Sequence, residues 1–113
     1  MGCNEMDYPV VGVTFEGRQD ILNRFYGRYA YGKKYGVRLF KEDDNQYDSN
    51  AVGVELETSP NVYEMVGYIP KDRNCELRAE WGRMKEASLR SIGPTRGNNI
   101  GLTISVKFEN RRA

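Results

Sequence analysis

The chain has 113 residues, of which 39% are hydrophobic and 29% are charged, and its net charge is only +1. This length fits one domain with a modest core, and no apolar run approaches the roughly 18 residues of a membrane-spanning helix. The sequence contains no histidine, which excludes catalytic systems that use an imidazole base and removes the most common metal ligand.

The two cysteines and the N-terminal residues indicate the cellular compartment of the protein. Cys3 and Cys75 lie far apart and form no CxxC pair. A structural zinc site needs four ligands, so we expect no metal and no cofactor. Residues 1–5 have neither the basic nor the apolar part of a signal peptide. We therefore expect a cytoplasmic protein with reduced thiols and no membrane partner.

Charge is segregated along the chain. Residues 18–41 carry seven bases and one acid, whereas residues 42–64 carry seven acids and no base. Two interpretations stand side by side. A nearly neutral protein with this layout can present a basic groove to a phosphate chain. Alternatively, the segments segregate charge by chance and interleave in the fold.

The predicted elements are many short strands and two helices. β-Branched, aromatic and alternating residues predict strands at 9–15, 37–41, 51–57, 62–69, 87–92 and 100–108. A helix is predicted at 18–26, ending at Gly27, because Ile21, Leu22 and Phe25 share one face. This order favours a mainly β fold with two short helices, arranged as a small β-barrel.

The second helix is predicted after Pro70. Asp72 or Asn74 could cap its N-terminus, and the spacing of Leu77, Trp81 and Met84 predicts one buried face. We expect one domain at residues 9–109, between a flexible N-terminus at 1–8 and a frayed tail at 110–113.

The densest local signal lies at residues 45–52, Asn-Gln-Tyr-Asp-Ser-Asn-Ala-Val. Asn and Asp bond their own backbone in turns, so a tight turn is one interpretation. A turn does not need Tyr47, however. The other interpretation is a binding site in which Tyr47 stacks on a ring while Asp48 accepts a hydrogen bond from a hydroxyl.

The pattern Asn-x-Tyr-Asp-x-Asn-Ala-Val resembles the signature of the HIRAN domain, a module at the N-terminus of certain SWI/SNF-type DNA translocases. The segments 11–19, 39–42 and 66–71 resemble HIRAN sequences in the same order. The resemblance runs from about residue 10 to residue 81, and the last two strands fit in type only. It implies a six-stranded OB-like or SH3-like β-barrel with two helices.

The resemblance also implies a ligand, because the best-understood HIRAN domains bind single-stranded DNA and prefer a free 3′-hydroxyl end. Asp48 would accept a hydrogen bond from that hydroxyl, and Tyr47 would stack on the terminal base. The other implied contacts are Asn45 holding the nucleotide, Phe15 as a second ring, Lys71 pairing with a phosphate, and Tyr68 where some members carry a histidine.

This sequence departs from the end-binding members at two positions. Thr14 stands where those members carry an arginine that grips phosphate, and Ile100-Gly101 stands where they offer an aromatic ring. Arg18 is a candidate replacement for the arginine; the alternative is a solvated residue at the start of a helix.

A segment at residues 28–38 interleaves aromatic and cationic side chains. Its candidate DNA-binding residues are Tyr29, Tyr31, Lys33, Lys34 and Tyr35. Such alternation suits a platform for single-stranded nucleic acid. The alternative is a hairpin whose tyrosines pack back onto the barrel.

No phosphate-binding loop of the type GxxxxGK[ST] is present, so we expect no motor and no catalysis. The sequence predicts a module that binds single-stranded DNA at its 3′ end and serves a nuclease, helicase or repair protein. The alternative is a protein-interaction module that has lost DNA binding. RNA stays open as a ligand, because the contact that separates it from DNA is to the 2′-hydroxyl.

Overall fold

The computed structural model describes residues 3–110, which form a single antiparallel sheet of six strands with two short helices. The strand order is β1-β6-β5-β2-β3-β4. The elements are β1 (Cys3–Pro9), α1 (Arg18–Tyr26), β2 (Gly36–Lys41), β3 (Val52–Ser59), β4 (Val62–Tyr68), α2 (Asn74–Ala79), the 3-10 turn η1 (Trp81–Arg83), β5 (Met84–Pro94) and β6 (Ile100–Glu109). The predicted mainly β fold with two short helices is confirmed.

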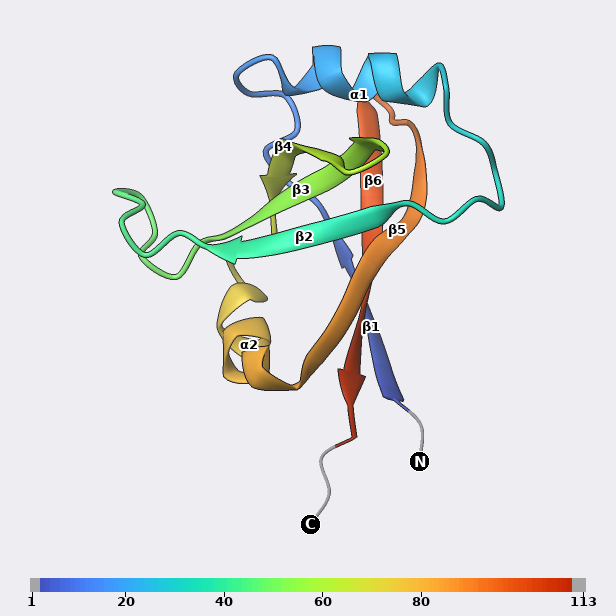
Figure 1. The fold of residues 1–113 in the computed structure, drawn as a ribbon. Coiled ribbons are helices and arrows are strands. Elements are labelled where there is room, and N and C mark those ends of the chain that lie inside the picture. The colour runs from blue at the N-terminus through green and yellow to red at the C-terminus, as the bar shows by residue number, and fades with distance from the viewer. Residues whose placement is uncertain (1–2, 111–113) are drawn as a thin grey trace.

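The sheet curls until the chain after β1 meets β4, although these two strands lie at opposite ends of the strand order (Figure 1). The Val11 N–H donates to the Tyr68 carbonyl at 2.8 Å, and the Tyr68 N–H donates back to the Val11 carbonyl at 2.9 Å. A Cβ atom on Gly67 would lie 2.4 Å from the Val11 carbonyl oxygen. This contact therefore requires glycine at position 67.

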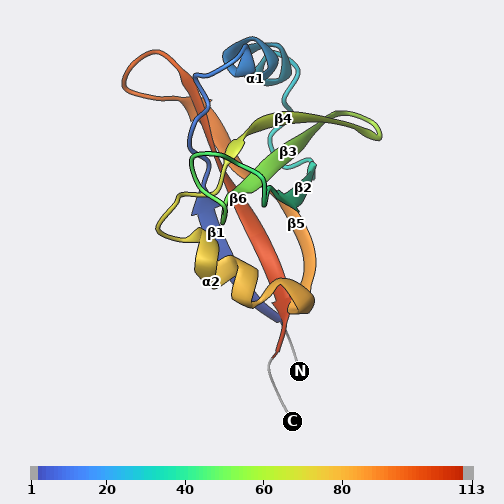
Figure 2. The same ribbon diagram turned by 90° about the vertical axis from the view of Figure 1, so that its left-hand side faces the viewer.

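The core lies inside the curled sheet. Val52, Val54 and Leu56 alternate along β3 and are fully buried. Helix α1 covers one end of the molecule with Leu22 and Phe25, and α2 lies at the opposite end (Figures 1 and 2). α2 buries Leu77, so each helix is fixed by the apolar residues it buries.

The N-terminal strand differs from the prediction. β1 occupies Cys3–Pro9 and pairs with β6 from Cys3↔Glu109 to Pro9↔Thr103, so the expected flexible N-terminus is wrong for residues 3–8. The predicted strand at 9–15 ends early because Gly12 has a φ of 72° and the chain turns there. Because β1 is rich in polar residues and its partner β6 is remote in sequence, the pattern of residues did not predict this strand. Residues 1, 2 and 111–113 lie outside the described part.

The second helix is also shorter than predicted. α2 ends at Ala79, Trp81 lies in η1, and Met84 begins β5. The spacing of Leu77, Trp81 and Met84 therefore does not define one helical face. The antiparallel pairing of Met84 with Phe108 and the low helix propensity of Gly82 account for the early end. Neither predicted N-cap holds, because Arg73 occupies that position without a side-chain cap.

Candidate nucleic-acid interface

A cleft of about 320 Å³ opens where the turn after β1, the loop between β2 and β3, and the chain after β4 come together. We call it the Tyr47 cleft. All six residues that the resemblance singled out as binding residues line it, together with Arg18; the six are Phe15, Asn45, Tyr47, Asp48, Tyr68 and Lys71. Residues far apart in sequence therefore share one surface hollow.

The 42–51 loop is organised by Asn45. The Asn45 Oδ1 atom accepts hydrogen bonds from the backbone N–H groups of Tyr47, at 2.8 Å, and of Asp48, at 2.9 Å. The predicted tight turn is thus present. The same turn leaves the Tyr47 side chain 87% exposed, and Phe15 across the cleft is 63% exposed. Both rings are free to stack on a planar ligand.

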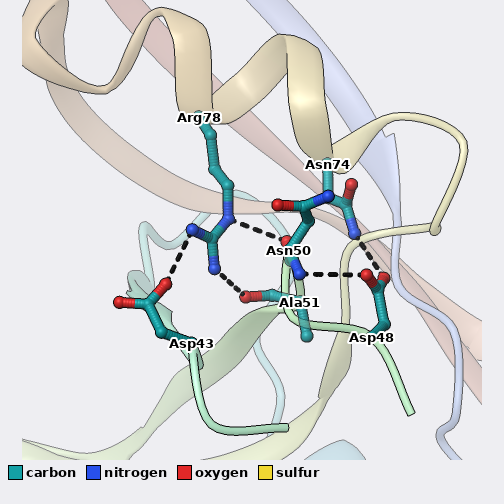
Figure 3. Close-up of polar contacts among 6 residues, drawn as sticks. All are labelled: Asp43, Asp48, Asn50, Ala51, Asn74 and Arg78. Atoms are coloured by element: carbon teal, nitrogen blue, oxygen red, sulfur yellow. Dashed lines mark hydrogen bonds and ion pairs between the residues drawn. The ribbon is translucent and has the colours of Figure 1, made fainter. Parts of the chain in front are cut away.

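The Asp48 carboxylate is held from two sides (Figure 3). Its Oδ1 atom accepts from the Asn50 N–H, and its Oδ2 atom accepts from the Asn74 Nδ2 atom, each at 2.9 Å. These two hydrogen bonds lower the pKa of the Asp48 carboxyl below its usual value. An ionised carboxylate offers about four lone-pair sites, so Asp48 can still accept from a ligand hydroxyl.

Helix α2 holds the loop through Arg78, which the sequence did not single out. Its Nε atom donates to the Asn50 carbonyl, its Nη2 atom donates to the Ala51 carbonyl, and its Nη1 atom pairs with Asp43, all at 2.8 Å (Figure 3). Asn74 and Arg78 are four residues apart, so they project from the same side of α2. That spacing was the signal that could have found them.

A second missed residue, Glu42, joins the loop to β4. Its Oε1 atom accepts from the Asn45 amide at 2.8 Å and from the Tyr68 hydroxyl at 2.7 Å. These hydrogen bonds lower the pKa of Glu42, and the same contact with Glu42 raises the pKa of Tyr68. The Tyr68 hydroxyl is therefore engaged inside the protein, and its ring is what the cleft presents.

Arg18 completes the floor of the cleft. Its guanidinium carbon lies 5.3 Å from the centre of the Tyr68 ring, and its Nη1 atom donates to the Gly12 carbonyl at 2.7 Å. Its Nη2 atom forms an ion pair with the Oε1 atom of Glu16 at 3.3 Å. The side chain is buried rather than solvated, so it is a fixed positive charge at the cleft.

The family model described as the HIRAN domain matches residues 4–109. The chain belongs to the HIRAN domain family. This confirms the predicted resemblance. The HIRAN domain is a DNA-binding module rather than a catalytic one. No curated protein and no solved structure matches this chain.

The described part of this HIRAN domain brings no three Cys, Asp or Glu side chains together as a metal site. Among the same residues, neither helix is long and apolar enough to cross a membrane.

The two departures that the resemblance singled out do not line the cleft. Neither Thr14 nor Gly101 is among the described residues that line it. Gly101 instead lines a separate hollow with residues of β5 and β6. Arg18 does line the cleft, so a cation is present there despite Thr14.

The tyrosine-rich segment at residues 28–38 follows the C-terminal end of α1 (Figure 1). The cleft includes Arg18, at the opposite end of that helix. Tyr35 packs edge-on against Phe25 with ring centres 4.9 Å apart, and the Tyr29 ring lies 6.1 Å from Phe25. These two tyrosines pack back against the hydrophobic core. Tyr31 is 95% exposed, and Lys33 and Lys34 are also exposed. The segment therefore contributes no residue to the Tyr47 cleft.

Proposed function

We propose that this HIRAN domain binds single-stranded DNA at a free 3′-hydroxyl end, in the Tyr47 cleft and without catalysis. One observation carries the proposal: an oriented, ionised carboxylate, Asp48, lines the same cleft as two exposed rings, Tyr47 and Phe15. In this arrangement the carboxylate accepts from the terminal hydroxyl while the rings stack on the bases.

The rings provide affinity without base selection. Every base has a π-face, and stacking on an aromatic side chain contributes about 1–3 kcal/mol per base. Because Tyr47 and Phe15 are already exposed, stacking on them requires no rearrangement of the core.

The carboxylate provides selectivity for the end. A 3′-phosphate would place nearly two negative charges beside Asp48 and would also remove the hydroxyl donor. Lys71 and Arg18 supply positive charge for the phosphate that precedes the terminal nucleotide. In the cell, such a module would recruit a nuclease, helicase or repair protein to DNA ends in the cytoplasm.

Fluorescence anisotropy with three short strands tests the proposal. The strands end in a deoxyribose 3′-hydroxyl, in a 3′-phosphate, or in a ribose that carries both hydroxyls. We expect the 3′-hydroxyl DNA to bind at least about tenfold more tightly than the 3′-phosphate DNA, since one charge-assisted hydrogen bond contributes about 1.5–3 kcal/mol. Equal affinity for both would refute end recognition. Tighter binding of the ribose end would make the ligand RNA.

A protein-interaction module is the second candidate. It is favoured by Thr14 and Gly101, which stand where the resemblance implies a phosphate-gripping arginine and an aromatic ring. Absence of binding to every strand at low salt would favour this candidate.

A further inference from the structure

Three arginines, two on α1 and one just after it, face β4 and the end of β3. The Arg18 guanidinium faces the Tyr68 ring, the Arg24 Nη2 atom lies 3.9 Å from Glu64 Oε1, and the Arg28 Nη2 atom donates to the Thr58 carbonyl at 2.7 Å. From Arg18 to Arg28 the partner residues have falling sequence numbers, because α1 and β4 run in opposite directions (Figure 1). They lead from the end of β4 to the end of β3. We call this row the arginine seam.

The arginine seam starts in the Tyr47 cleft and ends in a second hollow. This hollow has a volume of about 480 Å³ and lies between the tyrosine-rich segment and the β3–β4 hairpin. We call it the hairpin hollow. Its lining residues include the cations Arg28 and Lys33, the lysine Lys34, which pairs with Glu86, and the aromatic ring of Tyr35.

Two acids on this route, Glu57, which also lines the hairpin hollow, and Glu64, accept hydrogen bonds within the protein. Glu57 accepts from the Gly36 and Asn61 N–H groups, each at 3.0 Å, and Glu64 accepts from the Thr58 hydroxyl. Arg24 is available, since its side chain is 58% exposed and its ion pair with Glu64 is long. Exposed pairs of this kind contribute little, so a phosphate can replace the Glu64 carboxylate.

The spacing suits an extended strand. At about 1.5 Å per helical residue, Arg24 lies roughly 9 Å along the α1 axis from Arg18, and Arg28 lies just beyond the C-terminal end of the helix. Strands bound by OB folds cover about 4–16 nucleotides, so a strand held at its end in the cleft has further nucleotides to place. The 42–51 rim carries Asp43, Asp44 and Asp48, which disfavours a phosphate chain on that side.

We propose that the strand 5′ to the bound end runs along the arginine seam and that the hairpin hollow holds an upstream phosphate and base. Arg24 and Arg28 contact successive parts of the backbone, and Lys33 contacts the phosphate at the hollow. The inference rests on the proposed function, because the bound end in the Tyr47 cleft defines where the strand begins.

The test compares a trinucleotide and a dodecanucleotide, both with free 3′-hydroxyl ends, over a range of salt concentrations. The variants are Arg24→Gln and Lys33→Gln, and the matched control is Lys85→Gln, which removes an exposed charge at the start of β5, away from the seam. Each lost contact with a single strand reduces the slope of log affinity against log salt by about 0.7.

We expect the dodecanucleotide to bind more tightly than the trinucleotide, and each seam variant to lower the salt slope by about 0.7 for the dodecanucleotide only. Lys85→Gln should leave both strands unchanged. If both lengths bind with equal affinity, or if the seam variants behave like Lys85→Gln, the seam proposal is wrong while the cleft proposal stands. If neither strand binds to the wild-type protein, both proposals fail.

Discussion

The amide of Asn74 donates to the Oδ2 atom of Asp48 at 2.9 Å, which fixes a residue of α2 to the loop that carries the HIRAN signature. Asn74 is only 2% exposed, so the donor of this hydrogen bond is buried, whereas Asp48 stays partly exposed. It sets the orientation of the carboxylate before any ligand arrives. Asn74 is therefore a positioning residue for Asp48 under the proposed function.

Replacing Asn74 tests this positioning role. Asn74→Ala should lower the free energy of unfolding by about 1–3 kcal/mol, because a buried hydrogen bond is lost, and should reduce the preference for a 3′-hydroxyl over a 3′-phosphate. Urea denaturation and anisotropy measure the two effects. Asn23→Ala is the control, since Asn23 makes a similar hydrogen bond on the exposed side of α1. Full retention of the end preference would show that Asn74 does not position Asp48.

Tyr47 should matter for binding and not for stability, because its side chain is largely exposed. Tyr47→Ala should weaken binding of a short 3′-hydroxyl strand by about 1–3 kcal/mol, the contribution of one stacked base. Tyr47→Phe keeps the ring and should bind like the wild-type protein. Calorimetric titration with both variants measures this, and equal affinity of Tyr47→Ala and wild type would contradict the stacking role.

Acid should destabilise the protein through carboxylates whose pKa values are lowered. The pKa of Glu42 is below its ordinary value of 4.5, because its carboxylate accepts hydrogen bonds from Asn45 and Tyr68. A lowered folded-state pKa contributes stability that is present above the unfolded pKa and is lost as the pH falls through the folded value. Wild-type stability should therefore fall as the pH drops below about 4.5.

Glu42→Gln keeps the acceptor oxygen but removes this titration, so its unfolding free energy should depend less on pH in the same range. Urea unfolding at a series of pH values from neutral to strongly acidic compares the two proteins. Glu109→Gln serves as the control on an exposed residue. Identical pH profiles for Glu42→Gln and wild type would show that Glu42 does not contribute to acid sensitivity.

Glycine is required at position 67, because the chain after β1 passes close to β4 there. Gly67→Ala places a Cβ atom 2.4 Å from the Val11 carbonyl oxygen, and we expect a loss of about 1–3 kcal/mol from overpacking. Gly82→Ala is the control, because nothing lies within 4 Å of its added Cβ atom. Thermal unfolding of both variants tests the requirement, and an unchanged melting temperature for Gly67→Ala would contradict it.

The sequence alone was sufficient to predict the features that depend on residues close together in the chain. Helix α1 begins and ends where the 3.6-residue pattern and Gly27 predicted. The signature at residues 45–52 pointed to the family that the family model then matched. These features depend on neighbouring residues, so their information is contiguous in the chain.

Only the tertiary structure decided the features that depend on remote partners. β1 exists because β6 pairs with it across almost the whole length of the chain, and α2 stops early because Met84 joins the sheet. The roles of Asn74 and Arg78 depend on a loop that precedes them by more than 20 residues. The contacts of Arg18 and Arg24 with β4, and of Arg28 with Thr58 in β3, arise only when the helix packs on the sheet. Local patterns carry no information about which distant segment will cover them.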